Sequence, residues 1–145
     1  MADKTVVTTE FSVRYHETDK MGIVHHANYL HWFEVGRVEF MRQSGFPYRP
    51  LEEAGVFLPV TEISCKYHAS ALFDDAVEVR TWIDSYNKVR LTFAYEVYRL
   101  SDGEKLVSGK TEHVFQEAQS GHVVRMHKTY PDLHALIVER AGTTP

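Results

Sequence analysis

The run HHANYLHWFEVGRVEFMRQSG, residues 25–45, carries a long helical pattern to which the rest of the chain must be fitted. Tyr29, Phe33, Gly36 and Phe40 recur at intervals of four and three residues, which places them on one face of an α-helix. This face is broad and apolar. It must therefore pack against a second layer of structure.

The ends of this helix follow from its flanking residues. Asn28 is a favourable N-cap residue and Gly45 a favourable residue just beyond the last turn, so we predict a helix from Tyr29 to Ser44. Gly36 within the helix costs up to about 1 kcal/mol relative to alanine. Its presence indicates that another backbone passes close to the helix at this point.

The segments around the helix have the two-residue period of β-strands. Residues 5–15, TVVTTEFSVRY, are rich in β-branched and aromatic residues and predict a strand that ends at Tyr15. After a predicted helical turn, alternating strands are expected at 56–68, 76–83, 88–98 and 104–117. HVVRM, residues 122–126, is a candidate further strand, and Pro131 suits the first position of a C-terminal helix.

Alternation within the strands predicts which side chains are buried. The expected inward residues are Ile63, Cys65 and Tyr67, then Val77, Val79, Thr81 and Ile83, and then Val89, Leu91, Phe93, Tyr95 and Val97. Cys65 is accordingly interpreted as a core residue and not as a nucleophile. One strand, one long helix and consecutive strands joined by short turns predict an α+β fold with a five- or six-stranded antiparallel sheet. The sequence has no glycine-rich phosphate loop, which disfavours nucleotide-binding folds.

Length and charge narrow the functional classes. A chain of 145 residues fits one domain, which we expect over residues 1–140, followed by a disordered tail at 141–145. The net charge of −4 argues against nucleic-acid binding. No apolar run approaches the roughly 20 residues of a membrane-spanning helix, so a membrane partner is not expected either. One cysteine and no signal-like N-terminus indicate a cytoplasmic protein.

The loop between the first strand and the helix holds the candidate catalytic groups. Asp19 lies there, three residues before Gly22, and a carboxylate is favoured near a helix N-terminus. The backbone N–H of His26 lies at the helix start, where free amides can bind an oxyanion. A solvated loop aspartate is the competing interpretation of Asp19.

Other polar residues have structural interpretations that compete with functional ones. His25, His26 and His31 lack the usual four-residue spacing of helical metal ligands, and we predict neither a metal nor another cofactor. Glu34 and Arg37 are expected to form an ion pair on the helix, with a pocket-facing Glu34 as the alternative. Four basic residues near predicted strand ends either bind phosphates or are solvated: Lys88, Arg90, Arg125 and Lys128.

The run VRYHETDKMGIVHHANYLHWFEVGRVEFM, residues 13–41, resembles the signature of the hotdog-fold acyl-CoA thioesterases of the 4-hydroxybenzoyl-CoA thioesterase family. The residues that carry the resemblance are Tyr15, Asp19, Gly22, Asn28, Tyr29, Glu34 and Arg37. Weaker similarity continues through the later strands. The resemblance implies a long central helix wrapped by a curved antiparallel sheet, dimers whose sheets join and often pair into tetramers, and an active site at the subunit interface.

The resemblance also implies roles for individual residues. Asp19 matches the catalytic aspartate of the family, as nucleophile or as general base for water. His26 and Tyr15 match a histidine and a tyrosine of one branch, and another branch uses the backbone amide at the position of His26. We predict that these three residues are catalytic, and that the substrate contacts Gly22, Val24, His25, Asn28, Tyr29, Lys88 and Arg90.

The activity implied by the resemblance is hydrolysis of acyl-CoA to a free acid and CoA. The sequence leaves open whether the acyl group is hydroxybenzoyl-like or a short or medium aliphatic chain, and whether CoA or an acyl-carrier protein carries it. A non-catalytic acyl-CoA-binding protein is the alternative from another class. A hotdog dehydratase is less well supported, because residues 25–32 lack the Gly/Pro-rich approach that its catalytic histidine requires.

Overall fold

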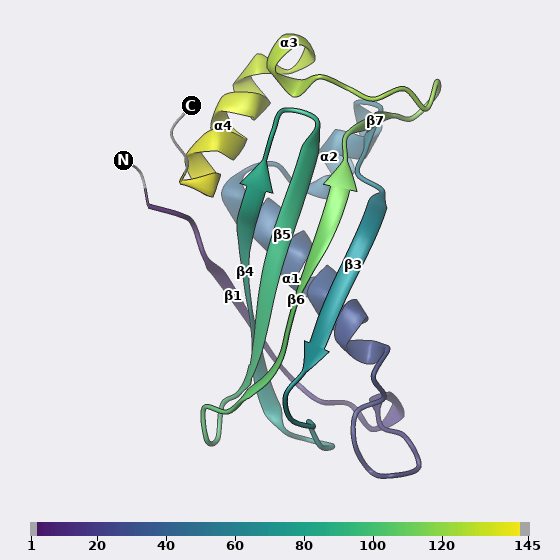
Figure 1. Ribbon diagram of the computed structural model, residues 1–145, viewed down its shortest axis with the longest axis vertical. Helices are drawn as coiled ribbons and strands as arrows, with labels where there is room; N and C mark the ends of the chain where they lie inside the picture. Colours follow the sequence, from purple (N-terminus) through teal and green to yellow (C-terminus); the bar gives the residue numbers. More distant parts are fainter. Residues whose placement is uncertain (1–2, 143–145) are drawn as a thin grey trace.

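A long helix lies across one face of a five-stranded sheet in the computed structural model, which describes residues 3–142 (Figure 1). The sheet is antiparallel, in the order β1-β4-β5-β6-β3, and its strands are β1 Val7–Ser12, β3 Val60–Tyr67, β4 Ala76–Tyr86, β5 Arg90–Arg99 and β6 Lys105–Val114. A separate pair consists of β2 Val56–Phe57 and β7 Gln116–Glu117. The helical elements are the 3-10 turn η1 Tyr15–Glu17 and helices α1 Asn28–Ser44, α2 Tyr48–Glu53, α3 Met126–Thr129 and α4 Pro131–Ala141. The predicted α+β architecture is confirmed.

Helix α1 matches the predicted long helix, with one difference at its start. Gly45 follows the last turn in the left-handed conformation, with φ of 94°, as expected. The predicted N-cap is wrong, because Ala27 occupies that position and Asn28 is already helical. The Asn28 amide instead donates to the Glu17 carbonyl at 2.7 Å, a contact with a distant loop that local sequence does not reveal.

The close approach predicted at Gly36 is real, but side chains make it and not another backbone. A Cβ at this position would lie 2.5 Å from Oγ1 of Thr81 and 2.8 Å from Cγ1 of Val79. Both residues point from β4 toward the helix. Gly36 therefore lets α1 settle directly onto the sheet.

The alternation prediction holds for the central strands and fails for β3. The predicted inward residues of β4 and β5 are buried, apart from the half-buried Val89. In β3, by contrast, Ile63 is 46% exposed, Tyr67 is 48% exposed and Cys65 is half-buried. The core assignment of Ile63 and Tyr67 is wrong, because β3 is an outer strand of the sheet, whereas Cys65 is partly buried and packs against the core.

The predictions near the chain ends were partly correct. The first strand ends at Ser12 and not at Tyr15, which lies in η1. No strand forms at 122–126, where a single bridge joins Val123 to Gln116. Pro131 does begin α4, which continues to Ala141, and the remaining expected tail, residues 143–145, lies outside the described residues. No helix within 3–142 is long and apolar enough to cross a membrane.

A chain of hydrogen bonds crosses the core between α1 and the sheet. Arg37 donates through Nε to the Tyr48 hydroxyl at 2.7 Å and through Nη1 to that of Tyr95 at 3.2 Å. The Tyr95 hydroxyl lies 2.6 Å from Oγ1 of Thr111, which lies 2.7 Å from Nε2 of His113. No ion pair between Glu34 and Arg37 is present among the described residues, since α1 points the guanidinium inward.

Candidate active site

A surface pocket of about 290 Å³ lies at the start of α1, between the β1–α1 loop and the end of β3. We call it the Asp19 pocket. Its lining residues are Asp19, Met21, Ile23, Val24, His26, Tyr29, Tyr67, His68, Ala69 and Ser70. The structure thus brings together Asp19 and His26, the two residues for which the family resemblance implies the main catalytic roles.

Asp19 is held in a small hairpin within the loop. Its N–H donates to the Ile23 carbonyl at 2.8 Å, and Thr18 and Val24 form an antiparallel bridge beside it. Its Oδ1 accepts the N–H of Met21 at 2.8 Å. Within residues 3–142, Oδ2 has no hydrogen-bond partner, so one carboxylate oxygen is available to a substrate or a water molecule.

Gly22 forms the tip of this hairpin. Its φ of +81° lies in the left-handed region that other residues rarely adopt, and its N–H donates to the Asp19 carbonyl at 3.0 Å. An added Cβ would meet no atom within 4 Å. Backbone conformation and not lack of space therefore requires glycine here, and Gly22 shapes the loop without lining the pocket.

The backbone N–H of His26 is available to bind a substrate oxygen. The amides on both sides are occupied: that of His25 donates to the Glu17 carbonyl at 2.9 Å, and that of Ala27 donates to Nδ1 of His25 at 3.2 Å. No residue that the structure describes accepts a hydrogen bond from the His26 N–H. The His26 carbonyl accepts the Tyr67 hydroxyl at 3.0 Å, which fixes the turn next to the free amide.

Two tyrosines form an aromatic wall of the pocket. Tyr29 is buried, its hydroxyl accepts the N–H of Ala71 at 3.1 Å, and its ring meets that of Tyr67 edge to face with centroids 5.6 Å apart. Desolvation raises the pKa of Tyr29 and raises that of Tyr67 to about 12. Both phenols therefore stay protonated near neutral pH, and Tyr67 remains a donor to His26.

Glu17, which the sequence did not indicate as a site residue, connects this loop to the helix. It is 2% exposed; Oε2 accepts the indole N–H of Trp32 at 2.7 Å, and Oε1 accepts the N–H of Arg14 at 2.8 Å. Its carbonyl accepts the His25 N–H at 2.9 Å and the Asn28 side-chain amide at 2.7 Å. The sequence shows only an acidic residue just after a predicted strand. Such a residue is ordinarily solvated, so its burial could not be predicted.

Burial alone would raise the pKa of the Glu17 carboxyl. Hydrogen bonds from the side chains of Arg14 and Trp32 and from the Arg14 backbone, together with the Arg14 charge, outweigh this effect and hold the pKa below its ordinary value. Glu17 is therefore an anion at neutral pH although it is buried.

The other predicted site residues have different places. Val24 is buried and lines the pocket, His25 stacks on the His26 ring with centroids 4.2 Å apart, and Asn28 binds Glu17. Tyr15 is 76% exposed, and its ring lies against Phe73 outside the pocket. A single chain therefore does not bring Tyr15 to Asp19.

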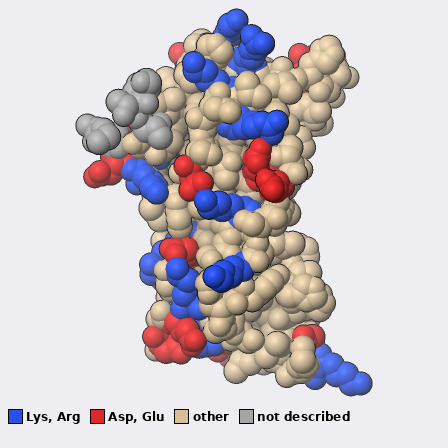
Figure 2. Space-filling view, in the orientation of Figure 1, with Lys and Arg blue, Asp and Glu red and all other residues tan. Residues whose placement is uncertain are grey.

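Lys88 and Arg90 lie at the opposite end of the sheet, at the β4–β5 turn (Figure 1). Lys88 has a φ of +79°, and Arg90 pairs with Glu112 at 2.8 Å. Figure 2 shows that Lys and Arg side chains gather at this end of the molecule. Because a strand rises roughly 3.4 Å per residue, one chain keeps these residues far from Asp19.

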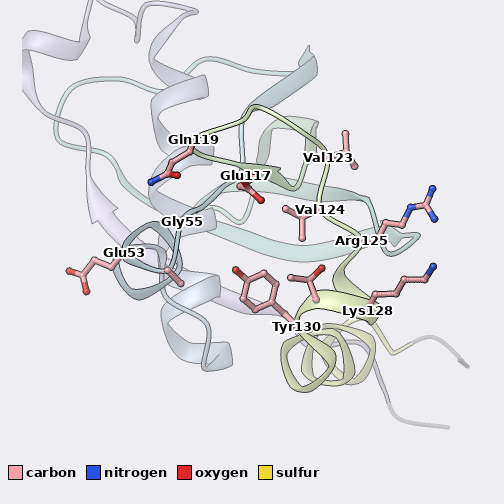
Figure 3. A pocket seen from close by; sticks show the side chains of 11 residues that line it. Glu53, Gly55, Glu117, Gln119, Val123, Val124, Arg125, Lys128 and Tyr130 are labelled. Carbon is pink, nitrogen blue, oxygen red and sulfur yellow. The ribbon is translucent and has the colours of Figure 1, made fainter.

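A second and larger pocket, of about 580 Å³, lies at this same basic end. Figure 3 shows Arg125 and Lys128 on one side of it and Glu53 on the other, with Tyr130 between them. Its lining includes none of the residues of the Asp19 pocket. Residues 3–142 contain no group of three or more His, Cys, Asp or Glu side chains that could hold a metal ion.

Comparison with known proteins identifies the class of this protein. A sequence profile of the thioesterase-like superfamily matches residues 13–135, and the chain belongs to that superfamily. It is a thioester hydrolase, and the hotdog fold expected from the sequence is confirmed.

Individual relatives match most of the chain. The putative acyl-CoA thioesterase YneP of Bacillus subtilis is 38% identical over 125 residues, which cover 86% of this chain and 90% of YneP. The structure of DHNA-CoA thioesterase from Staphylococcus aureus has a TM-score of 0.87 at 32% identity, over 97% of both chains. The gentisyl-coenzyme A thioesterase BH1999 has a TM-score of 0.72 at 27% identity, over 77% of this chain and 89% of that one.

Proposed function

We propose that this chain hydrolyses acyl-CoA thioesters to a free acid and CoA, and that the reaction takes place in the Asp19 pocket. The observation that carries the proposal is that two residues with unused hydrogen-bonding groups line this pocket: among residues 3–142, Oδ2 of Asp19 and the backbone N–H of His26 have no partner. The names of YneP and of the two structural relatives support CoA thioesters as the substrate class.

The two groups have complementary tasks in thioester hydrolysis. Attack on the thioester carbonyl builds negative charge on its oxygen, and we assign the His26 N–H as the donor that receives that charge. One such donor contributes about 3–4 kcal/mol in the transition state. Asp19 either attacks the carbonyl carbon, forming an anhydride that water opens, or takes a proton from an attacking water. In both routes the C–S bond breaks and CoA leaves as a thiolate that then takes up a proton.

We propose an aromatic acyl group as the preferred substrate. The rings of Tyr29, Tyr67 and His26 line the pocket, and aromatic rings favour edge-to-face and offset contacts with one another. The structural relatives named for DHNA-CoA and gentisyl-CoA support the same class.

The predicted contacts of Lys88 and Arg90 with CoA phosphates require a second copy of the chain. Both residues lie at the end of the sheet opposite Asp19, so we propose that a neighbouring subunit supplies them. Lys88 is the stronger candidate, because the ion pair with Glu112 partly neutralises Arg90. The chain belongs to a thioesterase-like superfamily, and no observation favours a dehydratase or a non-catalytic acyl-CoA-binding protein.

A hydrolysis screen tests this proposal. CoA release is followed by thiol titration with gentisyl- and benzoyl-CoA, with butyryl- and hexanoyl-CoA, and with one acyl-carrier-protein thioester. We expect kcat/KM for the aromatic CoA thioesters to exceed that for the aliphatic ones by about tenfold or more, since ring contacts add about 0.5–1.5 kcal/mol each. Equal rates would contradict the acyl preference. Absence of release from every thioester would contradict the function.

A further inference from the structure

We propose that Glu17 is a positioning residue: it holds Asp19 and the His26 amide in one geometry without touching the substrate. This inference rests on the proposed function of the Asp19 pocket and deepens it. Glu17 does not line the pocket. It nevertheless accepts hydrogen bonds from Arg14 next to η1, from His25 in the turn and from Trp32 in α1.

The side chain of Glu17 joins the loop to α1. The Arg14 backbone and the Trp32 indole, which lie on opposite sides of the catalytic loop in sequence, donate to its two carboxylate oxygens at 2.8 and 2.7 Å. The Arg14 guanidinium adds a contact of 3.3 Å. The Glu17 carboxylate therefore holds residues 14–17 against α1.

The backbone carbonyl of Glu17 fixes the other half of the pocket. It accepts the His25 N–H and the Asn28 amide, which immediately precede and follow the His26–Ala27 turn. The His25 amide is used in this way and the Ala27 amide donates to Nδ1 of His25, so the His26 amide between them is the one left free. Asp19 follows Glu17 by two residues, so both reacting groups are set by the same anchor.

The chemistry of this anchor requires a carboxylate. Both groups that meet its oxygens at the shortest distances are N–H donors, so each oxygen must accept. A glutamine has the same shape, but its NH₂ group must face either the Trp32 indole or the Arg14 N–H. Two donors then oppose each other in a buried site, and the loop must shift to relieve the contact.

The substitution Glu17→Gln tests the inference. We expect kcat to fall about 10- to 100-fold, because small misplacement of reacting groups has effects of this size, while KM changes less than about threefold. In Glu17→Gln/Trp32→Phe the indole donor is gone and the NH₂ group can face the phenyl ring. The Arg14 guanidinium also contacts Oε2, but its side chain is 66% exposed and can turn to solvent. We expect kcat of this double variant to rise at least about fivefold above that of Glu17→Gln.

Matched variants separate positioning from folding. Glu78→Gln removes a carboxylate from an ion pair with Arg80 outside the pocket and should leave kcat within about twofold. Melting temperatures are measured throughout, since a purely structural role lowers stability without changing kcat per folded molecule. A kcat of Glu17→Gln within twofold of the parent, or no recovery in the double variant, would overturn the inference.

Two further variants keep the test decisive. If Glu17→Gln does not fold, Asn28→Ala removes one bond to the Glu17 carbonyl and should lower kcat about 3- to 10-fold at unchanged KM; an unchanged kcat would overturn the inference. Asp19→Asn is assayed in parallel. Loss of activity in Asp19→Asn with parental kcat in Glu17→Gln defeats only the Glu17 inference, whereas parental kcat in Asp19→Asn defeats the proposed function.

Discussion

His113 in β6 is fully buried and has a hydrogen-bond partner on each ring nitrogen. Its Nδ1 donates to the Leu58 carbonyl at 3.0 Å, and its Nε2 lies 2.7 Å from the Thr111 hydroxyl. Burial, with a smaller contribution from the Arg37 charge, lowers the pKa of His113 to about 4. The folded protein therefore holds a neutral imidazole that becomes protonated much more readily after unfolding.

This difference predicts how stability depends on pH. The unfolded imidazole has a pKa of about 6.5, so between pH 6.5 and 4 the unfolded state binds more protons than the folded state. The contribution of His113 to the free energy of unfolding is present above pH 6.5 and is lost as the pH falls toward 4, by about 3 kcal/mol. Urea unfolding at pH 7, 5.5 and 4.5 measures this loss in the free energy of unfolding.

The comparison variant is His113→Gln, which cannot titrate. It should be less stable than the parent at pH 7, and its free energy of unfolding should fall less steeply with acid. His122→Gln, at an exposed position, should follow the parent at every pH. Parallel curves for the parent and His113→Gln would rule out His113 as the source of the acid sensitivity.

At the scale of elements, α1 and the central strands follow from local pattern and β3 does not. Apolar periodicity placed α1 to within one residue at its start, and alternation identified the buried faces of β4 and β5. The same alternation gave a wrong prediction of the buried residues Ile63 and Tyr67 in β3. A period of two separates the two faces of a strand, but it does not show whether another layer covers either face. The prediction of Asn28 as N-cap is wrong, because its side chain donates a hydrogen bond to the distant Glu17 carbonyl and does not cap the helix.

The exposed edge of β3 leads to a prediction about assembly. Val60 and Ile63 are 42% and 46% exposed on an outer strand, and the dimers implied by the family resemblance have joined sheets. We propose that two copies pair along β3. The parent should then sediment at twice the 16.8 kDa of one chain or more, and Ile63→Arg should shift it toward the single-chain mass, because a charge would enter the interface.

Leu100→Arg provides the control for this experiment, since Leu100 is 41% exposed at the β5–β6 turn and away from the paired edge. It should retain the parental mass. A parent that sediments as a single chain at micromolar concentration would contradict pairing along β3, as would an Ile63→Arg variant with unchanged mass.

At the scale of the whole molecule, the sequence indicated the contents of the catalytic loop but not the far wall of its pocket. Asp19 and His26 lie seven residues apart and could be recognised together. Tyr67 reaches His26 across a sequence separation of 41 residues, which no local pattern encodes. Lys88 and Arg90 were grouped with Asp19 by their charge, whereas the topology of the sheet places them at the opposite end.

The most direct measurement is the rate of CoA release by Asp19→Asn beside that of Asp74→Asn, with the best substrate of the screen. Asp74 is an exposed loop aspartate with a φ of 69°, which asparagine tolerates, so the same change of charge is made outside the pocket. We expect kcat/KM to fall about 10²- to 10⁴-fold in Asp19→Asn and to stay within about twofold in Asp74→Asn. An Asp19→Asn variant that keeps its rate within about threefold of the parent would contradict catalysis by Asp19.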